Sequence, residues 1–250
     1  MKQVARLFIL ALGAALAFAK PASAQGTGQA VDLALVLAVD ISNSMDATQF
    51  QLQMAGLSQA FEDQAVQDAI VSGRHGRIIV TLVAWSDKPR IAIPWTPLGN
   101  ELEAFSFAET IRDLPRIAGN FTCMSDALNF VSDRVLPLQP VPAERQIVDV
   151  SGDGRENCNP RKPLDAVRSE LVAKGVTING LPILEGAEAD LLEQWYMDNV
   201  IGGPFAFVLP AQGYNDFARA IRRKFLVEIS RAIGDASGAL GSETGANSLN

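Results

Sequence analysis

LALVLAVDISNSMD, residues 33–46, begins as an apolar run and ends in polar side chains. The apolar part belongs to a mainly aliphatic segment, 31–39, of the kind found in strands that are covered on both faces. Asp40, Ser42 and Ser44 follow at every second position. The pattern predicts a buried strand that delivers one carboxylate and two hydroxyl groups to the edge of a sheet.

Apolar runs and helical patterns alternate along the rest of the chain. This alternation indicates βα crossovers, so we expect an α/β fold with a doubly wound, mainly parallel sheet and helices on both faces. Pro94 and a short preceding turn make 90–95 an antiparallel edge strand paired with 77–85. The remaining strands are predicted at 145–154, 176–184 and 204–209, and the helices at 49–70, 101–114, 125–136, 164–174, 188–200 and 214–233.

The two ends of the 250-residue chain differ in composition from the part between them. Residues 1–24 have a basic start, an apolar run and a small-x-small site, which predicts a secretory signal peptide. A membrane anchor is the alternative, but the run is shorter than the roughly 20 residues that span a bilayer. We expect one domain over 25–233, a disordered polar tail over 234–250, and a periplasmic or secreted protein without stable membrane insertion.

The charge balance excludes some classes of partner. The chain carries 21 basic and 28 acidic residues, a formal net charge of −7, and loss of the leader would remove Lys2, Arg6 and Lys20 but no acid. Nucleic acids and anionic lipids need a basic face for their phosphate groups. We therefore expect no nucleic-acid partner.

Three predicted loops carry oxygen donors near the carboxyl ends of strands. Asp40, Ser42 and Ser44 form the first group, Thr122 precedes a helix, and Asp153 follows the strand at 145–154. Carboxylates and hydroxyls suit a small divalent cation, Mg²⁺ or Mn²⁺, better than Ca²⁺. The alternative is that Asp40 and Ser44 only cap the first helix.

These motifs resemble the metal-ion-dependent adhesion site of von Willebrand factor type A domains. The likeness rests on Asp-x-Ser-x-Ser at 40–44, Thr-x-x-x-x-Ala-Leu at 122–128 and Ser-Gly-Asp-Gly at 151–154. The chain is most similar to a secreted proteobacterial A-domain-like family of unknown function. This narrower resemblance rests on the segments LALVLAVDIS, VDVSGDG and FARAIRRKFLVEIS. Asn43 departs from the family pattern, in which glycine is frequent at this position. Asn tolerates a left-handed backbone better than most residues, so the departure is modest.

The resemblance implies roles for these residues. Ser42, Ser44 and Thr122 would bind the cation directly, and Asp40 and Asp153 directly or through water. An exposed acidic side chain of a partner protein would complete the metal shell. Ser151 and Gly152 precede Asp153 where the family often has a bulkier residue and threonine, so the orientation of Asp153 is open.

Cys123 and Cys158 are the only cysteines of the chain. If Thr122 and Asp153 flank one ion, both sulfurs lie beside it and can form a disulfide in an oxidising compartment. Two independent free thiols are the alternative.

Three functions remain open at this point. The first is an exported, non-catalytic module that captures an acidic group of a partner through the cation. The second is a metal-dependent hydrolase of phosphate or sulfate esters, although no histidine lies in the three loops. The third is a subunit of a periplasmic assembly with a purely structural metal site.

Overall fold

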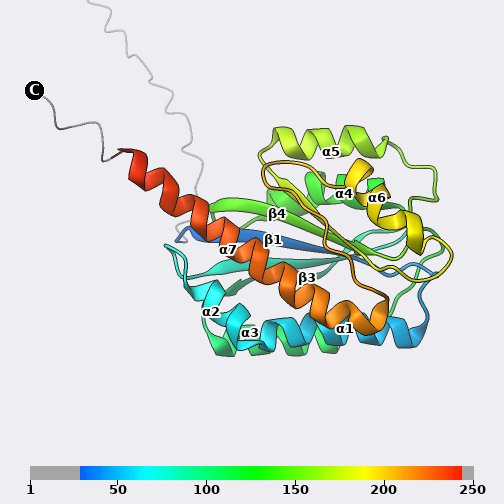
Figure 1. Cartoon of the computed structure of the whole chain (residues 1–250), viewed down its shortest axis with the longest axis horizontal. Coiled ribbons are helices and arrows are strands. Elements are labelled where there is room, and N and C mark those ends of the chain that lie inside the picture. Colours follow the sequence, from blue (N-terminus) through cyan, green and yellow to red (C-terminus); the bar gives the residue numbers. More distant parts are fainter. Residues whose placement is uncertain (1–28, 244–250) are drawn as a thin grey trace, which may run out of the picture.

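The computed structural model describes residues 29–243, with side chains to residue 232. Its centre is a five-stranded sheet with the strand order β3-β2-β1-β4-β5 (Figure 1). Four strands are parallel, and β3 is antiparallel to β2. The strands are β1 (Val31–Asp40), β2 (Ile78–Trp85), β3 (Arg90–Leu98), β4 (Ala143–Gly152) and β5 (Thr177–Pro182).

Strand β1 lies in the middle of the sheet, between β2 and β4, and both of its faces are covered. All ten of its residues are buried. Leu33, Leu35 and Leu37 point into one apolar core, while Val36 and Ala38 point into a second core on the opposite face. This alternation follows from the two-residue period of a strand.

The helices cover the two faces of the sheet (Figure 1). One layer contains α1 (Ala47–Glu62), α2 (Gln64–Val71), α3 (Glu101–Arg112) and α7 (Phe217–Glu243). The other contains α4 (Met124–Phe130), α5 (Leu164–Ala173) and α6 (Ala189–Asn199). Short helical turns complete the fold: η1 (Val131–Val135), η2 (Leu136–Leu138) and η3 (Tyr214–Asp216).

This architecture confirms the predicted fold class, including the antiparallel edge strand and the helices on both faces. The chain leaves β1 toward β2 on one side and reaches β4 on the other. Ligand sites in doubly wound sheets lie at such a switch point, outside the carboxyl ends of the strands. The ends of β1 and β4, at Asp40 and Gly152, meet there.

The helix predicted at 49–70 is two helices, α1 and α2. Asp63 interrupts the run in an extended conformation (φ −70°, ψ 126°), and its carboxylate accepts hydrogen bonds from the backbone N–H groups of Ala65 and Val66. Arg222 of α7 donates to the same carboxylate at 2.6 Å. A cap of this kind starts a new helix where hydrophobic spacing alone predicts a continuous one.

The strand predicted at 204–209 is not a strand in the structure. This segment touches β5 through an isolated bridge between Gly180 and Val208. Phe205 has a left-handed backbone (φ 58°), and so does Gly203 (φ 89°). Two left-handed residues so close together prevent the continuous pairing that an apolar run predicts.

The closing helix is longer than predicted. It runs to Glu243, so residues 234–243, expected in a disordered tail, are helical. Extending an existing helix adds one hydrogen bond for each residue fixed, which offsets the poor helix propensity of glycine and serine. The predicted signal peptide, 1–24, and the end of the tail, 244–250, lie outside the described residues.

No helix between residues 29 and 243 has both the length and the apolar content needed to cross a membrane.

Candidate metal centre

The first loop of the site lies between β1 and α1. Asp46 caps α1: it accepts a hydrogen bond from the N–H of Gln49, whose side chain accepts one from the N–H of Asp46. The interpretation of Asp40 and Ser44 as caps of this helix is therefore wrong. Neither Asp40 nor Ser44 is the N-cap of α1, so both side chains can take part in a metal site.

The five residues predicted as a metal site come together from three loops. The hydroxyl of Ser44 donates to Oδ1 of Asp153 at 2.7 Å. The Oγ atoms of Ser42 and Ser44 are 3.0 Å apart, and Oγ1 of Thr122 lies 3.4 Å from Oγ of Ser42. Oδ1 of Asp40 accepts the backbone N–H of Ser42 at 2.8 Å. Oxygen donors separated by up to 113 residues in sequence thus form one cluster.

Asp40 is the least accessible member of the cluster. Its side chain is fully buried, and its Oδ2 has no hydrogen-bond partner among the described residues. A Cβ atom at Gly152 would lie 2.9 Å from this oxygen, so only glycine lets β4 pass so close to it. Buried carboxylate oxygens are normally paired, and an unpaired one is costly. A cation at this position would satisfy it.

The electrostatics of the cluster agree with this fit. Burial and, to a lesser extent, the negative charge of Asp153 together raise the pKa of Asp40 to about 7, although hydrogen bonds from Ser42 lower it. The five side chains contain two carboxylates and no cationic group. A divalent cation favours the ionised form of both carboxylates, and the hard oxygen donors suit Mg²⁺ or Mn²⁺.

Two tyrosines that lie outside the sequence motifs support the cluster. The buried Tyr214 donates from its hydroxyl to Oδ2 of Asp153 at 2.9 Å, so both oxygens of this carboxylate are held. Tyr196 donates to the carbonyl of Gly152 at 3.4 Å. Burial raises the pKa of both hydroxyls, which stay protonated and act as donors. Neither tyrosine lies in a motif that sequence spacing can connect with the loops.

Asn43 is held differently from the expectation. Its φ is not positive, since Phe205 is the only non-glycine residue in the described part with a left-handed backbone. Instead, its amide donates to Oδ1 of Asn120 at 3.1 Å. Asn43 thereby links the first loop to the loop of Thr122.

A disulfide joins the other two loops, as predicted. Cys123 and Cys158 are bonded, with their Cα atoms 5.5 Å apart. The N–H of Thr122 donates to the side chain of Asn157 at 2.8 Å, and the N–H of Asn157 returns a bond to the carbonyl of Thr122 at 3.1 Å. The covalent link and this reciprocal pair hold Thr122 in place.

The two sulfurs and the carboxylate of Asp126 lie within 4.8 Å of one another. This group has the residue types of a metal site, but disulfide sulfurs are not thiolates and do not bind a metal as thiolates do. The oxygen cluster is therefore the better candidate.

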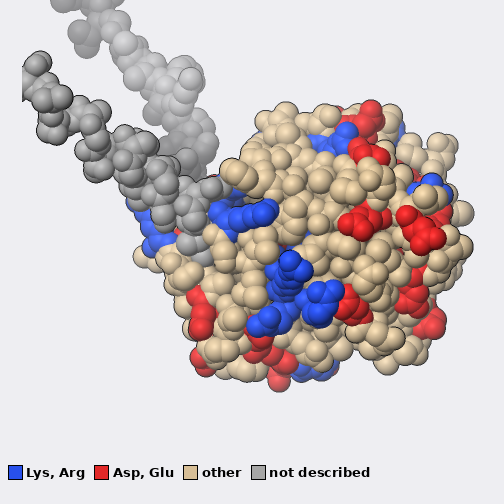
Figure 2. All heavy atoms as spheres, in the orientation of Figure 1, with Lys and Arg blue, Asp and Glu red and all other residues tan. Residues whose placement is uncertain are grey.

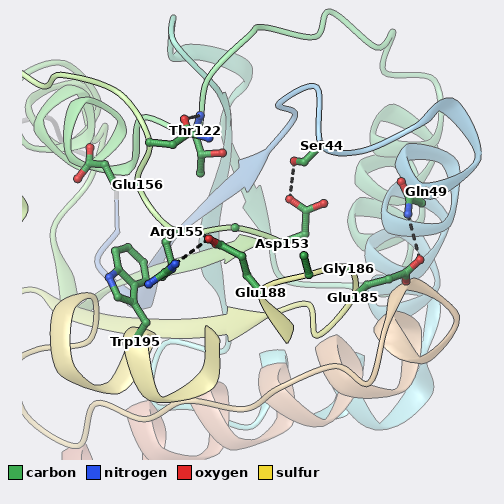
Figure 3. A pocket seen from close by; sticks show the side chains of 13 residues that line it. Ser44, Gln49, Thr122, Asp153, Arg155, Glu156, Glu185, Gly186, Glu188 and Trp195 are labelled. Atoms are coloured by element: carbon green, nitrogen blue, oxygen red, sulfur yellow. Dashed lines mark hydrogen bonds and ion pairs between the residues drawn. The ribbon is translucent and has the colours of Figure 1, made fainter. Parts of the chain in front are cut away.

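The cluster opens into a cavity of about 700 Å³. Figure 3 shows Ser44, Thr122 and Asp153 on one side of it and Trp195 on the other. Arg155 donates to Glu188 at 2.8 Å across part of its wall. The remaining lining residues are Gln49, Gly154, Glu156, Asn157, Glu185, Gly186 and Ala187.

Charge is unevenly distributed over the surface. Figure 2 shows acidic side chains at the end of the molecule that carries these loops and basic ones along α7. The exposed basic residues of α7 include Arg219, Arg222 and Arg223. The site thus lies at the acidic end of the molecule.

Comparison with known families decides the classification. The family model described as "Protein of unknown function (DUF1194)" matches residues 30–233. The chain belongs to the DUF1194 family. No curated protein matches the DUF1194 chain.

Solved structures show that the DUF1194 chain has a von Willebrand factor type A-like fold. Proximal thread matrix protein 1 of the mussel byssus, with a zinc-occupied MIDAS motif, matches with a TM-score of 0.59 and 18% identity over 80% of this chain and 48% of that one. A von Willebrand factor type A protein from Catenulispora acidiphila has a TM-score of 0.57 and 15% identity, over 82% and 43%. The pilus adhesin SpaC from Lactobacillus rhamnosus GG has a TM-score of 0.58 and 14% identity, over 84% and 31%.

The DUF1194 chain spans about half the length of the mussel structures that it matches, and less of the two bacterial ones. At these identities the likeness concerns the fold.

Proposed function

We propose that this protein is an exported, non-catalytic binding module that captures an acidic group of a partner protein through a divalent cation. The observation that carries the proposal is the convergence of five oxygen-bearing side chains, one of which is the buried Asp40, whose Oδ2 has no hydrogen-bond partner among the described residues. In this proposal the direct ligands of the cation are Ser42, Ser44 and Thr122. Asp40 and Asp153 bind the cation directly or through water. The cation is Mg²⁺ or Mn²⁺.

The partner's acidic group reaches the cation from the adjoining cavity. Ser44 is exposed and lines this cavity together with Thr122 and Asp153. Mg²⁺ bound through one or two carboxylates keeps coordination positions that water fills, so a further oxygen ligand can enter there. A carboxylate of the partner supplies this ligand.

Two structural neighbours support a cation-dependent interaction. The mussel protein has a zinc-occupied MIDAS motif, and SpaC is a pilus adhesin. Both are distant in sequence, so they support the class of function and leave the choice of metal and partner to experiment.

The position of the single histidine favours binding over hydrolysis. His75 follows α2 and hydrogen-bonds to Glu144 near the start of β4, whereas the cluster lies at the end of β4. Ser42 and Ser44 therefore have no imidazole base nearby to activate them as nucleophiles. We propose no catalytic role for either serine.

The disulfide supports the proposed location. Structural disulfides persist in oxidising compartments, and the bond between Cys123 and Cys158 lies beside the proposed site. This agrees with a periplasmic or secreted protein.

Thermal unfolding tests the metal site. The chelated protein is titrated with Mg²⁺ or Mn²⁺ beside Asp40→Ala and the control Asp68→Ala, which changes an exposed carboxylate on α2. At a hundredfold excess over the dissociation constant, the cation is expected to stabilise the parent and the control by about 2.7 kcal/mol. Asp40→Ala should show no such gain. Equal responses in all three proteins would overturn the site.

A capture experiment separates a bridging cation from a structural one. Immobilised protein is exposed to the periplasmic or secreted proteins of its source, with Mg²⁺ or with chelator. Loss of a captured partner in chelator, while circular dichroism shows an intact fold, supports bridging. Capture that persists in chelator and in Asp40→Ala would contradict it.

A further inference from the structure

A second cavity lies beside α1, and its lining shares no residue with the cavity of the metal cluster. It measures about 430 Å³ and lies between α1 and the segment that follows α3. Most of its wall is apolar, and its lining residues, all within the described part of the chain, include no acidic side chain. They are Ala47, Phe50, Gln51, Met54, Ala55, Arg112, Leu114 and Arg116, and we call this cavity the α1 groove.

A second, narrow void lies next to the α1 groove. A space of about 10 Å³, roughly enough for one water molecule, shares Phe50, Met54 and Leu114 with the groove. Its inner wall includes Leu82 of β2 and Arg90 of β3. The apolar side chains of Phe50, Met54 and Leu114 thus separate the groove from a void against the sheet.

The groove and the void are each lined by an arginine with an N–H group that has no acceptor among the described residues. Arg116 donates to the carbonyl of Met45, but its Nε is shielded from solvent and has no hydrogen-bond partner in the part of the chain that the structure describes. Nε of Arg90 is also shielded from solvent and has no hydrogen-bond partner among the described residues. Buried donors of this kind are nearly always paired in native proteins, and leaving one unpaired is unfavourable.

The other arginine of the groove is already neutralised. Arg112 forms an ion pair with Glu62 and also donates to Ser58 at 2.8 Å. Arg116 has no ion pair among the residues from 29 to 232 that the structure gives, and it takes up only a carbonyl oxygen. The groove therefore offers one uncompensated positive charge over an apolar floor.

We propose that the α1 groove binds a small organic carboxylate with an apolar body. The carboxylate accepts hydrogen bonds from the guanidinium group of Arg116, whose planar fork matches its geometry. The apolar body covers Phe50, Met54 and Leu114. A groove of this volume, near the lower end of the range for ligand pockets, limits the ligand to a small molecule. This site does not depend on the proposed metal function.

Calorimetric titration of the full chain in chelator tests the proposal, with 4-phenylbutanoate as the probe and its neutral amide as the matched ligand. The acid is expected to bind the parent at least about tenfold more tightly than the amide, because a hydrogen bond between charged groups is lost with the amide. In Arg116→Gln, affinity for the acid should fall roughly ten- to a hundredfold for the same reason.

Two further variants control for effects on folding. Ala55→Trp fills the half-exposed rim of the groove without changing an arginine and should abolish binding. Arg74→Gln makes the same charge change at an exposed position between α2 and β2 and should leave binding unchanged. Equal affinity for acid and amide, no binding of the acid at millimolar concentration, or unchanged binding in Ala55→Trp would each overturn the proposal.

Discussion

Strand β4 and the residue directly after it contribute carboxylates to two clusters of opposite design. Asp149, within the strand, lies 2.6 Å from Nζ of Lys224 on α7, and Lys224 also contacts Glu228. All three are buried, and Asn179 donates to Glu228 at 2.8 Å. The contact between Lys224 and Asp149 is not aligned as a hydrogen bond, since neither oxygen of Asp149 has such a partner among the described residues, so it acts as an ion pair.

Asp153, four residues along the chain, lies in a cluster without a cationic side chain. Its oxygens accept hydrogen bonds from Ser44 and Tyr214, and its neighbour Asp40 has one oxygen with no partner in the part of the chain that the structure describes. Where β4 is enclosed by α7, the chain supplies its own cation. At the open end of the strand it leaves two carboxylates beside a cavity, which is the arrangement expected where the cation comes from solution.

The largest effect is expected when the buried side chain of Lys224 loses its positive charge. Lys224→Met leaves Asp149 and Glu228 buried without a counter-charge, which should lower the free energy of unfolding by about 3–5 kcal/mol. Urea denaturation measures it, with the exposed Arg223→Met as control. The variant should keep its response to Mg²⁺, because the two clusters are separate. A loss no larger than that of the control would break the comparison.

Removal of the disulfide should have the next largest effect. The bond closes a loop of 35 residues, and in the chain-entropy model this contributes roughly 3–4 kcal/mol. Replacing both Cys123 and Cys158 by serine should lower the free energy of unfolding by that amount. A dithiol reductant should produce a similar loss in the parent and none in the double variant. A reductant effect on the double variant would show that the loss has another cause.

Tyr214→Phe sharpens the assignment of the open cluster. The hydroxyl of Tyr214 orients Asp153, and loss of a partner that orients a metal ligand typically weakens metal binding about ten- to a hundredfold. Calorimetric titration with Mg²⁺ measures this, and Tyr196→Phe is the matched control, since its hydroxyl meets a backbone carbonyl. Equal affinities in the two variants would place Asp153 outside the metal's surroundings.

The smallest effect is a change in pH dependence at the closed cluster. Burial and, to a lesser extent, the charge of Asp149 together raise the pKa of Glu228 to about 7, although the pairing with Lys224 lowers it. Between about pH 4.5 and pH 7 the folded protein therefore binds more protons than the unfolded chain, so this group makes stability fall as pH rises. Glu228→Gln should remove that fall, as unfolding at pH 5 and pH 7.5 can measure. An identical pH profile in parent and variant would contradict it.

The sequence predicted the order of strands and helices because local periodicity reports burial directly. It missed the break at Asp63, which depends on a side-chain cap, and the left-handed backbone at Phe205, which no hydrophobic pattern reveals. It also ended the last helix too early, because the composition after residue 233 resembles a polar tail while the structure extends the helix to Glu243.

The candidate site also contains residues that a local motif predicts and residues that only the fold brings together. Asp40, Ser42 and Ser44 were predictable from a motif of five residues at a strand end. Tyr214 lies 61 residues from Asp153, and only the path of the chain after β5 brings them together. The cluster around Lys224 was missed as well, because a lysine in a helix gives no sign in the sequence that it will be fully buried.

The disulfide between the two ligand loops also bears on the kinetics of the proposed metal exchange. Thr122 and Asp153 lie on segments that Cys123 and Cys158 join, so folding and oxidation order both loops before a cation arrives. Binding then requires no loop closure, and such preorganisation lowers the cost of association. The rate at which Mg²⁺ enters should be governed by the slow loss of its own water molecules. The faster ligand exchange of a larger, more weakly hydrated ion would then show directly in the rate of entry.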